Sequence, residues 1–323
     1  MTTIKGTPQV GPRIICLTGP TGSGKTGAAL YLAAKLQEKG LPATIINADS
    51  RQLYAAFPII TAQPTECEQA KSPHLLYGYL NIQEKSTAWQ WAEFARAKIE
   101  SLTANGILPI LVGGTGMYLK ALLDGFAPIP QPDPNISQTL LAECGQNGPQ
   151  PLHARLTKID PDYAGRIHPN DRQRVIRALE VWQSTGKTFT WWHAQTTPPH
   201  PRQALRLGMG LPLPELEPFL KRRIDIMLDM GALAEANAAL KACPDLKAPG
   251  WSGIGCLELG QYLAGQISWE SCKERWLHNT RAYAKRQWTW FRADSRIQWF
   301  RPGQEDAMLA VLCSFLRAAP PTS

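Results

Sequence analysis

The residues best suited to chemistry lie near the amino end, in the run Gly19-Pro20-Thr21-Gly22-Ser23-Gly24-Lys25-Thr26. This run fits the spacing G-x-x-x-x-G-K-[ST], in which glycines let backbone N–H groups converge on phosphate oxygens. Lys25 would add a full positive charge, and the hydroxyl of Thr26 suits Mg²⁺. The sequence therefore predicts a polyphosphate-binding loop, without indicating which polyphosphate it binds.

An acidic residue that could act beside this loop is Asp49, which follows the apolar run Ala43–Asn47. An ordinary ATPase carries an aspartate at the end of a core strand, but the run ILPILV ends in Gly113-Gly114-Thr115-Gly116. The carboxyl ends of parallel strands share one edge of a sheet with the phosphate loop. Asp49 is thus a candidate general base or ligand of a metal-bound water, and a turn or helix-capping aspartate is an equally good interpretation.

These residues need an α/β framework to position them. Apolar runs of strand length alternate with helical spacing, which is typical of a parallel sheet covered by helices on both faces. Strands are predicted at 13–18, 43–47, 107–112 and 204–211, and helices at 27–39, 87–103 and 268–292. The expected fold class is α/β, a P-loop NTPase-like core.

An inserted domain interrupts this predicted core. Proline-rich joints, APIPQPDP and TTPPHPRQ, flank a stretch with helical patterns and no convincing strand. We expect a core formed by 1–126 and 201–323, and an all-helical insertion at 127–200.

The charge of the chain indicates an anionic partner. Its 323 residues carry 34 Lys and Arg against 26 Asp and Glu. The excess is concentrated at 166–187, with five cations against two acids, and at 273–301, with eight against two. Tryptophans interleave with both segments and could stack on unpaired bases, although for any single tryptophan a place in the core is the better interpretation. The pattern as a whole favours nucleic acid.

The remaining composition narrows the class of protein. Seven scattered cysteines without a C-x-x-C pair favour reduced thiols in the cytoplasm, and the six histidines lack metal-ligand spacing. No run approaches the ~18 apolar residues of a membrane helix, so we expect no membrane association. A monomer is the expected oligomeric state.

Several motifs together resemble one family. GPTGSGKT, DSRQ, GGTGMYLKALLDG, HPNDRQRVIRALEV and NTRAYAKRQWTWFR occur in the order seen in bacterial tRNA dimethylallyltransferases, also called tRNA isopentenylpyrophosphate transferases. The similarity runs from about Ile14 to Arg292. The resemblance implies transfer of a dimethylallyl group from dimethylallyl diphosphate to N6 of the adenosine immediately 3′ of the anticodon, with a helical insertion that clasps the anticodon stem-loop.

The resemblance also implies roles for individual residues. The donor diphosphate would lie on the loop from Gly19 to Thr26, with Mg²⁺ on Thr26 and Arg223 reaching the diphosphate. Asp49 would be the general base and Thr115 would lie close to the target nucleoside. The residues implied to contact tRNA are Asp49, Ser50, Arg51, Gln52, Thr115, Gln173, Arg174, Val175, Ile176, Arg177, Lys285, Arg286, Gln287, Trp288, Thr289, Trp290, Phe291 and Arg292.

Some positions depart from the family pattern. Cys256 and Leu257 stand where the family often has Tyr-Lys, Phe219 replaces an arginine one turn before Arg223, and Ser137 replaces an arginine of some members. These departures bear on the affinity for tRNA and not on the chemistry.

Two other functions fit part of the sequence. A P-loop small-molecule kinase would explain the loop and Asp49, but not the two basic, tryptophan-rich segments. A non-catalytic, nucleotide-switched RNA-binding protein would explain the charge, but would leave Asp49 without a task.

Overall fold

A computed structural model of the chain describes residues 13–196 and 203–318. The chain divides into two compact units, Met1–Leu123 with His200–Ser323, and Asp124–Pro199. The helical insertion was expected at 127–200, and each of these bounds lies within three residues of the observed bound of the smaller unit. The proline-rich joint TTPPHPRQ lies mostly at 197–202, outside the described residues.

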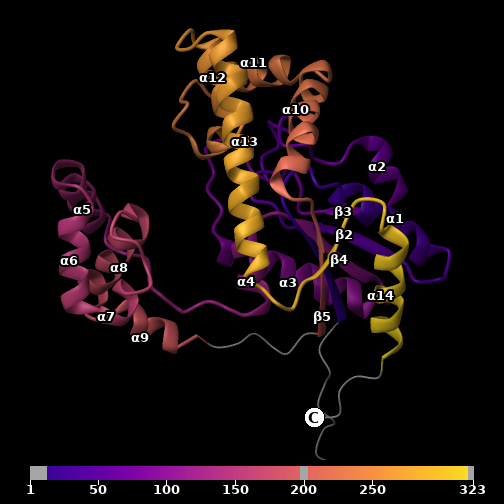
Figure 1. Cartoon of the computed structure of the whole chain (residues 1–323), viewed down its shortest axis with the longest axis horizontal. Helices are drawn as coiled ribbons and strands as arrows, with labels where there is room; N and C mark the ends of the chain where they lie inside the picture. Colours follow the sequence, from indigo (N-terminus) through magenta and orange to yellow (C-terminus); the bar gives the residue numbers. More distant parts are fainter. Residues whose placement is uncertain (1–12, 197–202, 319–323) are drawn as a thin grey trace, which may run out of the picture. The chain divides into compact units, whose positions relative to one another are not determined.

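The larger unit is built on a six-stranded parallel sheet in the order β3-β2-β4-β1-β5-β6 (Figure 1). The strands are β1 Arg13–Thr18, β2 Ala43–Asn47, β3 His74–Leu75, β4 Leu108–Gly113, β5 Gln203–Met209 and β6 Gln298–Phe300. The predicted bounds of β1 and β2 are confirmed, and those of β4 and β5 lie within two residues of the observed ones. The edge strands β3 and β6 were missed, since runs of two or three residues carry no alternating pattern.

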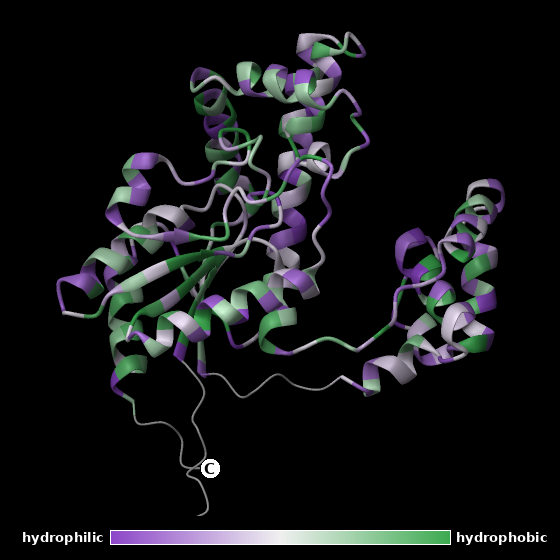
Figure 2. Ribbon diagram, turned by 180° about the vertical axis from the view of Figure 1, so that it is seen from behind, coloured by the Kyte–Doolittle hydropathy of each residue, from purple (hydrophilic) through white to green (hydrophobic). Residues whose placement is uncertain are grey.

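Helices cover both faces of this sheet. On one face, α1 (Lys25–Gln37) and α14 (Glu305–Arg317) share an apolar core with β1, β4 and β5. On the other, α3 (Ala88–Ala104) packs beside α4 (Gly116–Leu123), and Trp91 of α3 stacks on Tyr118 of α4 with ring centroids 4.4 Å apart. Figure 2 shows the strands mostly in the colours of apolar residues between these layers. The expected α/β architecture is confirmed.

A further group of helices stands on the carboxyl edge of the sheet. It consists of α10 (Leu213–Asp229), α11 (Ala232–Ala242), α12 (Cys256–Leu263) and α13 (Trp269–Arg292), with the short helices α2 (Glu66–Lys71) and η1 (Pro249–Ser252) nearby in the larger unit. Their core surrounds the fully buried Trp251 and the nearly buried Trp276. Helix α13 begins after Ser268, whose hydroxyl accepts a hydrogen bond from Ser271 N, so the predicted long helix is confirmed.

The described part of the smaller unit contains helices and connecting segments, with no strand. Its helices are α5 Pro134–Asn147, α6 Gln150–Ile159, α7 Pro161–Ala164, α8 Arg172–Thr185 and α9 Phe189–Ala194. They enclose a separate core that includes Leu140, Leu156, Val175 and Leu179. Asp160 joins α7 to α9, because its carboxylate accepts from Thr190 N at 2.9 Å and from Thr190 Oγ1 at 2.6 Å.

Among the helices at 13–196 and 203–318, each is too short or too polar to cross a lipid bilayer.

Candidate active site

The glycine-rich loop connects β1 to α1 as the sequence predicted. Gly19, Gly22 and Gly24 have φ angles of 141°, 78° and 87°, in the region that favours glycine. At Gly19 a Cβ would lie only 2.0 Å from Met209 O of the neighbouring strand, so a side chain is excluded there. The hydroxyl of Ser23 is buried without a hydrogen-bond partner, which is the condition of a loop shaped to hold an anion.

Three charged side chains meet beside this loop: Lys25, Asp49 and Arg223. Burial lowers the pKa of Lys25 to about 7, while Asp49 raises it and Arg223 lowers it further. Burial also lowers the pKa of Arg223, and the same aspartate raises it. Lys25 Nζ donates to Pro20 O at 2.6 Å. Two cations that burial leaves short of solvation, with a single carboxylate between them, make a site that favours an added anion.

The turn after β2 fixes Asp49. The fully buried side chain of Asn47 accepts from Asp49 N at 2.7 Å and donates to Asp49 O at 3.0 Å. Asp49 Oδ1 accepts from Arg51 N at 2.9 Å, so this oxygen serves the turn. Oδ2 lies toward Gly114. The structure thus confirms the turn role of Asp49, and the residue also lines the cavity described below. Its role as a general base stays a prediction.

Thr115 connects the turn after β4 to the turn after β2. Its Oγ1 accepts from Ser50 N at 2.9 Å and donates to Ser50 Oγ at 3.2 Å, and its own N donates to Ala48 O at 3.1 Å. Thr115 therefore lies directly behind the Asp49 turn. Arg51 Nη1 donates to Ser252 Oγ at 2.6 Å, and Gln52 Nε2 donates to Thr61 O and Ala62 O.

A cavity of about 370 Å³ is lined by Lys25, Asp49, Arg51, Gln52 and Arg223, whereas Ser50 and Thr115 are not among its lining residues. Its lining includes Lys25, Arg51, Arg223 and Arg286, and the single carboxylate of Asp49. The phosphate loop contributes one part of the lining, and apolar side chains contribute another part. This other part is made by Ile60, Ala62, Ile224, Met227, Ile254 and Trp276, with Thr280, Tyr283 and Tyr77 among them.

Sequence reasoning missed most of these cavity residues. Trp276, Thr280 and Tyr283 recur at i, i+4 and i+7 on α13, and Arg223 and Met227 lie one turn apart on α10. The spacing signals a shared face, but a core face gives the same pattern. Tyr77 has no motif at all. Its neighbour Leu76 has a φ angle of +63°, and burial together with Asp49 raises the pKa of Tyr77.

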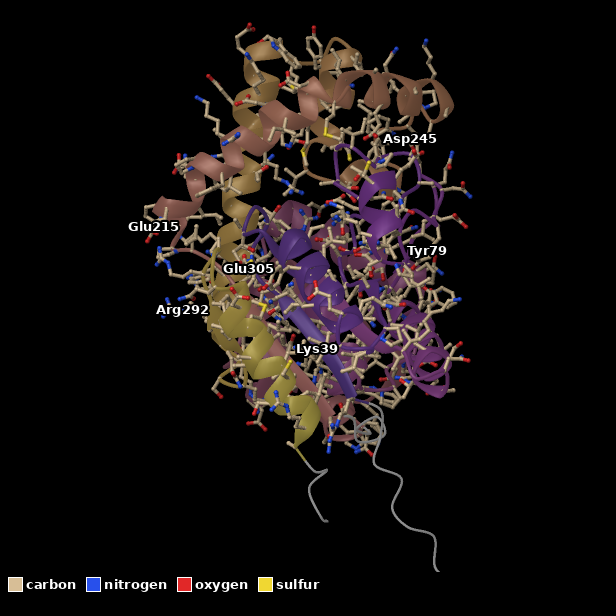
Figure 3. The ribbon with its side chains drawn as sticks, turned by 90° about the vertical axis from the view of Figure 1, so that its right-hand side faces the viewer. Lys39, Tyr79, Glu215, Asp245, Arg292 and Glu305 are labelled. Carbon is tan, nitrogen blue, oxygen red and sulfur yellow. The ribbon has the colours of Figure 1, made fainter. Side chains whose placement is uncertain are left out.

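Helix α13 presents the expected cations on its outer side. Lys285, Arg286, Thr289, Trp290 and Arg292 are exposed, and Arg286 also lines the cavity. Figure 3 shows Arg292 at the edge of the larger unit. Trp288 is half-buried, packed edge-on against Trp299 with ring centroids 4.7 Å apart. Gln287 and Phe291 are buried, and their expected contact with tRNA stays a prediction.

The helical unit gives a mixed outcome for the strip from Gln173 to Arg177. Gln173 and Arg174 are exposed, and Arg174 pairs with Asp171. Arg177 lies 3.5 Å from Glu180. Val175 and Ile176 point into the core of this unit, and their expected contact with tRNA stays a prediction. The helical period explains this, because a strip of five consecutive residues includes both faces of α8.

The departures from the family pattern lie in different environments. Cys256 is fully buried at the start of α12, and burial raises the pKa of its thiol well above the usual value. Leu257 and Ser137 are half-buried. Phe219 is exposed on α10.

In the parts of the chain that the structure describes, no group of three His, Cys, Asp or Glu residues could hold a metal ion.

Comparison with known proteins places this geometry in a family. The model of the family described as IPP transferase matches residues 52–294. A tRNA dimethylallyltransferase of Nitratidesulfovibrio vulgaris (strain Miyazaki F) is 54% identical over 320 residues, covering 94% of each chain. The solved full-length tRNA isopentenylpyrophosphate transferase of Bacillus halodurans is 30% identical, with a TM-score of 0.68 and coverage of 94% of this chain and 96% of that one.

A eukaryotic dimethylallyltransferase acting on tRNA has a TM-score of 0.72 at 28% identity, and the match covers 94% of this chain and 77% of that chain. Because the family model spans most of the chain and the relatives match almost end to end, this protein belongs to the IPP transferase family and is a transferase enzyme.

Proposed function

We propose that this enzyme transfers a dimethylallyl group from dimethylallyl diphosphate to N6 of the adenosine immediately 3′ of the anticodon of tRNA. The observation that carries the proposal is the cavity, whose lining combines the cationic phosphate loop, Asp49 and a set of apolar side chains. A prenyl diphosphate has this same division between an anionic and an apolar half. The names of the relatives agree with such a donor and with tRNA as the acceptor.

The leaving group sets the main catalytic demand. The bond between C1 of the donor and its diphosphate oxygen must break, and negative charge then builds up on the diphosphate. Lys25, Arg223 and the backbone N–H groups of the loop lie where they can stabilise that charge. Their positions are fixed before reaction, because Lys25 is hydrogen-bonded to Pro20 O and the loop glycines hold conformations closed to other residues.

Asp49 acts on the acceptor in this proposal. The N6 amine is a weak nucleophile because its lone pair is delocalised into the adenine ring. As the bond from N6 to C1 forms, Asp49 takes a proton from N6 through the oxygen not held by Arg51 N. Thr115, behind the Asp49 turn, keeps this carboxylate aligned through Ser50.

Mg²⁺ is the proposed cofactor. The hydroxyl of Thr26 and the carboxylate of Asp49 line the same cavity, and oxygen ligands completed by phosphate and water are the set that Mg²⁺ prefers. When bound on Thr26, the ion would neutralise charge on the diphosphate.

The anticodon stem-loop would bind the exposed cations of both units. Lys285 and Arg292 are exposed on α13, and Arg286 is exposed and also lines the cavity. Arg172 is exposed at the start of α8, beside the exposed amide of Gln173. The target base must leave its stack to reach Asp49, since the reacting groups lie within a cavity. We further propose a monomer that works in the cytoplasm, which agrees with its cysteines being free thiols.

The kinase alternative places adenine and ribose in the cavity, and the RNA-binding alternative involves no transfer. Incubating the protein with tRNA, dimethylallyl diphosphate and Mg²⁺ and analysing the nucleosides by mass spectrometry separates the three. One parallel reaction contains ATP in place of dimethylallyl diphosphate, and another uses the Asp49→Asn variant. A prenylated adenosine that requires both the donor and Asp49 is the expected product.

A further inference from the structure

One residue of α13 differs from its neighbours in direction and bonding. Gln287 is 4% exposed, whereas Lys285 and Arg286, just before it on the same helix, are exposed. Burying the side-chain amide of Gln287 costs free energy unless its oxygen and its nitrogen are both hydrogen-bonded. The question is therefore which groups it contacts.

Both ends of the amide are engaged, and by two different loops. Gln287 Oε1 accepts from Thr21 N of the phosphate loop at 2.8 Å. Gln287 Nε2 donates to Gly114 O of the loop after β4 at 2.9 Å. An N–H lies opposite the oxygen and a carbonyl lies opposite the nitrogen, so turning the amide over would break both bonds.

The two loops serve opposite halves of the proposed reaction. Thr21 belongs to the loop that would hold the donor diphosphate. Gly114 precedes Thr115, which bonds to Ser50 N and so supports the turn that carries Asp49. Gln287 therefore bridges the phosphate loop and the loop of Gly114. Among the described residues, no other side chain makes hydrogen bonds to both loops.

The fit around this amide is close. A Cβ added at Gly114 would lie 1.9 Å from Gln287 Nε2 and 3.5 Å from Asp49 Oδ2. The backbone of Gly114 thus approaches the amide and the carboxylate in a space that has no room for a side chain. A geometry this tight transmits a shift of one loop to the other.

We propose that Gln287 is a positioning residue that fixes the phosphate loop relative to the Asp49 turn. It acts through Thr21 N and Gly114 O and sets the separation between the donor carbon and the acceptor amine. This inference rests on the proposed function, because it takes the diphosphate to lie in the loop. It differs from the tRNA contact implied by the position of Gln287 among exposed cations, since its polar atoms are already used inside the protein.

Gln287→Met tests the role, because methionine has nearly the same length and shape but cannot form either hydrogen bond. We expect the KM for dimethylallyl diphosphate to rise about tenfold and kcat to fall about tenfold. The Kd for an anticodon stem-loop should stay within about twofold of the parent value. Gln266→Met, at an exposed glutamine after α12, is the matched control and should change neither quantity.

Gln287→Glu provides the second variant. It keeps an acceptor for Thr21 N, loses the donor to Gly114 O, and places a negative charge beside the diphosphate. Its KM for the donor should exceed that of Gln287→Met. Thermal unfolding shows whether each variant is folded. If Gln287→Met does not fold, the KM and Kd values of Gln287→Glu test the positioning role of Gln287.

Weaker binding of the stem-loop with an unchanged donor KM would overturn the inference in favour of an RNA contact. Unchanged values in both variants would overturn it as well. Transfer by the parent protein is measured first, so its failure counts against the proposed function. In that case, the Kd for inorganic pyrophosphate is compared between the parent protein and Gln287→Met. This comparison still tests whether Gln287 positions the phosphate loop.

Discussion

Lys25, Asp49 and Arg223 concentrate the chemistry of the site in a small space. Burial disfavours both cations, which lowers the pKa of Lys25 to about 7 and also lowers the pKa of Arg223. A fold gains nothing in stability from such a lysine. In the proposed function this cost is offset when the diphosphate of the donor binds, so the cations would be in place before the donor arrives.

Asp49→Asn should remove general-base catalysis while preserving the local structure. Asparagine can still accept from Arg51 N, so the turn should survive. We expect transfer to slow by about 10² to 10⁴ and the Kd for tRNA to change little. Single-turnover rates and binding by filter retention check this. A rate close to that of the parent would exclude the general-base role.

The lowered pKa of Lys25 predicts proton uptake when the donor binds. At pH 8 the free amine is mostly neutral, since its pKa is about 7, and a bound diphosphate would raise that pKa. Binding at pH 8 should then take up a proton, and binding at pH 6 should not, so donor affinity falls as pH rises through 7. Calorimetry in buffers of different ionisation enthalpy measures this uptake. Lys25→Arg, always charged, should abolish the pH 8 uptake; equal uptake in both proteins would contradict the assignment.

Helix α13 serves the site with two faces. Trp276, Thr280 and Tyr283 line the cavity, and Lys285 and Arg292 are exposed on the outer side. Arg286 is exposed and also lines the cavity. In the proposed function, one helix would thus bring RNA to the edge of the donor site. Its outward cations differ from Arg281 and Arg301, which pair with Glu217 and Glu215 of α10.

Replacing Lys285 and Arg286 together by alanine should weaken tRNA binding and reduce its dependence on salt. Each lost phosphate contact lowers the slope of log K against log salt by about 0.7 to 0.9. The charge-matched control is Arg281→Ala with Arg301→Ala, whose side chains are held by glutamates. Equal losses in the two double variants would show that only total charge matters.

The junction of α13 with α4 predicts a stability effect. A Cβ at Gly116 would lie 1.9 Å from Trp290 Nε1, so Gly116→Ala must displace the indole. We expect a loss of about 1–3 kcal/mol in the free energy of unfolding. Gly145→Ala in α5 is the control, because a Cβ there meets nothing within 4 Å, and it should stabilise by up to about 1 kcal/mol. Denaturant titration measures the free energy of unfolding of both variants. An unchanged value for Gly116→Ala would show that the Trp290 indole moves aside without cost.

At the scale of the molecule, donor and RNA sites should be separable. The helical unit has a core of its own, and the cavity is lined entirely by residues of the larger unit. Arg166→Glu with Arg172→Glu, at two exposed positions of the helical unit, should weaken tRNA binding about tenfold or more. Calorimetry should show unchanged affinity for inorganic pyrophosphate, and a parallel loss of both affinities would contradict separate sites.

The sequence was informative where local pattern and tertiary position coincide. β1, the glycine loop and α1 form one continuous segment, so their arrangement could be predicted from spacing alone. Tyr77, Ile60 and Trp276 come from distant segments, and only tertiary packing brings them to one cavity. The inward turn of Gln287 was likewise hidden, because its sequence neighbours are exposed cations and its partners, Thr21 and Gly114, are far away along the chain.

The most direct test of the account is the identity of the group that Asp49 and the glycine loop transfer. Purified protein is mixed with tRNA, Mg²⁺ and dimethylallyl diphosphate, and digested nucleosides are weighed by mass spectrometry. The account predicts one added five-carbon prenyl unit on an adenosine next to the anticodon, absent with Asp49→Asn. Unmodified tRNA with the donor, together with phosphoryl transfer when ATP is supplied, would contradict it.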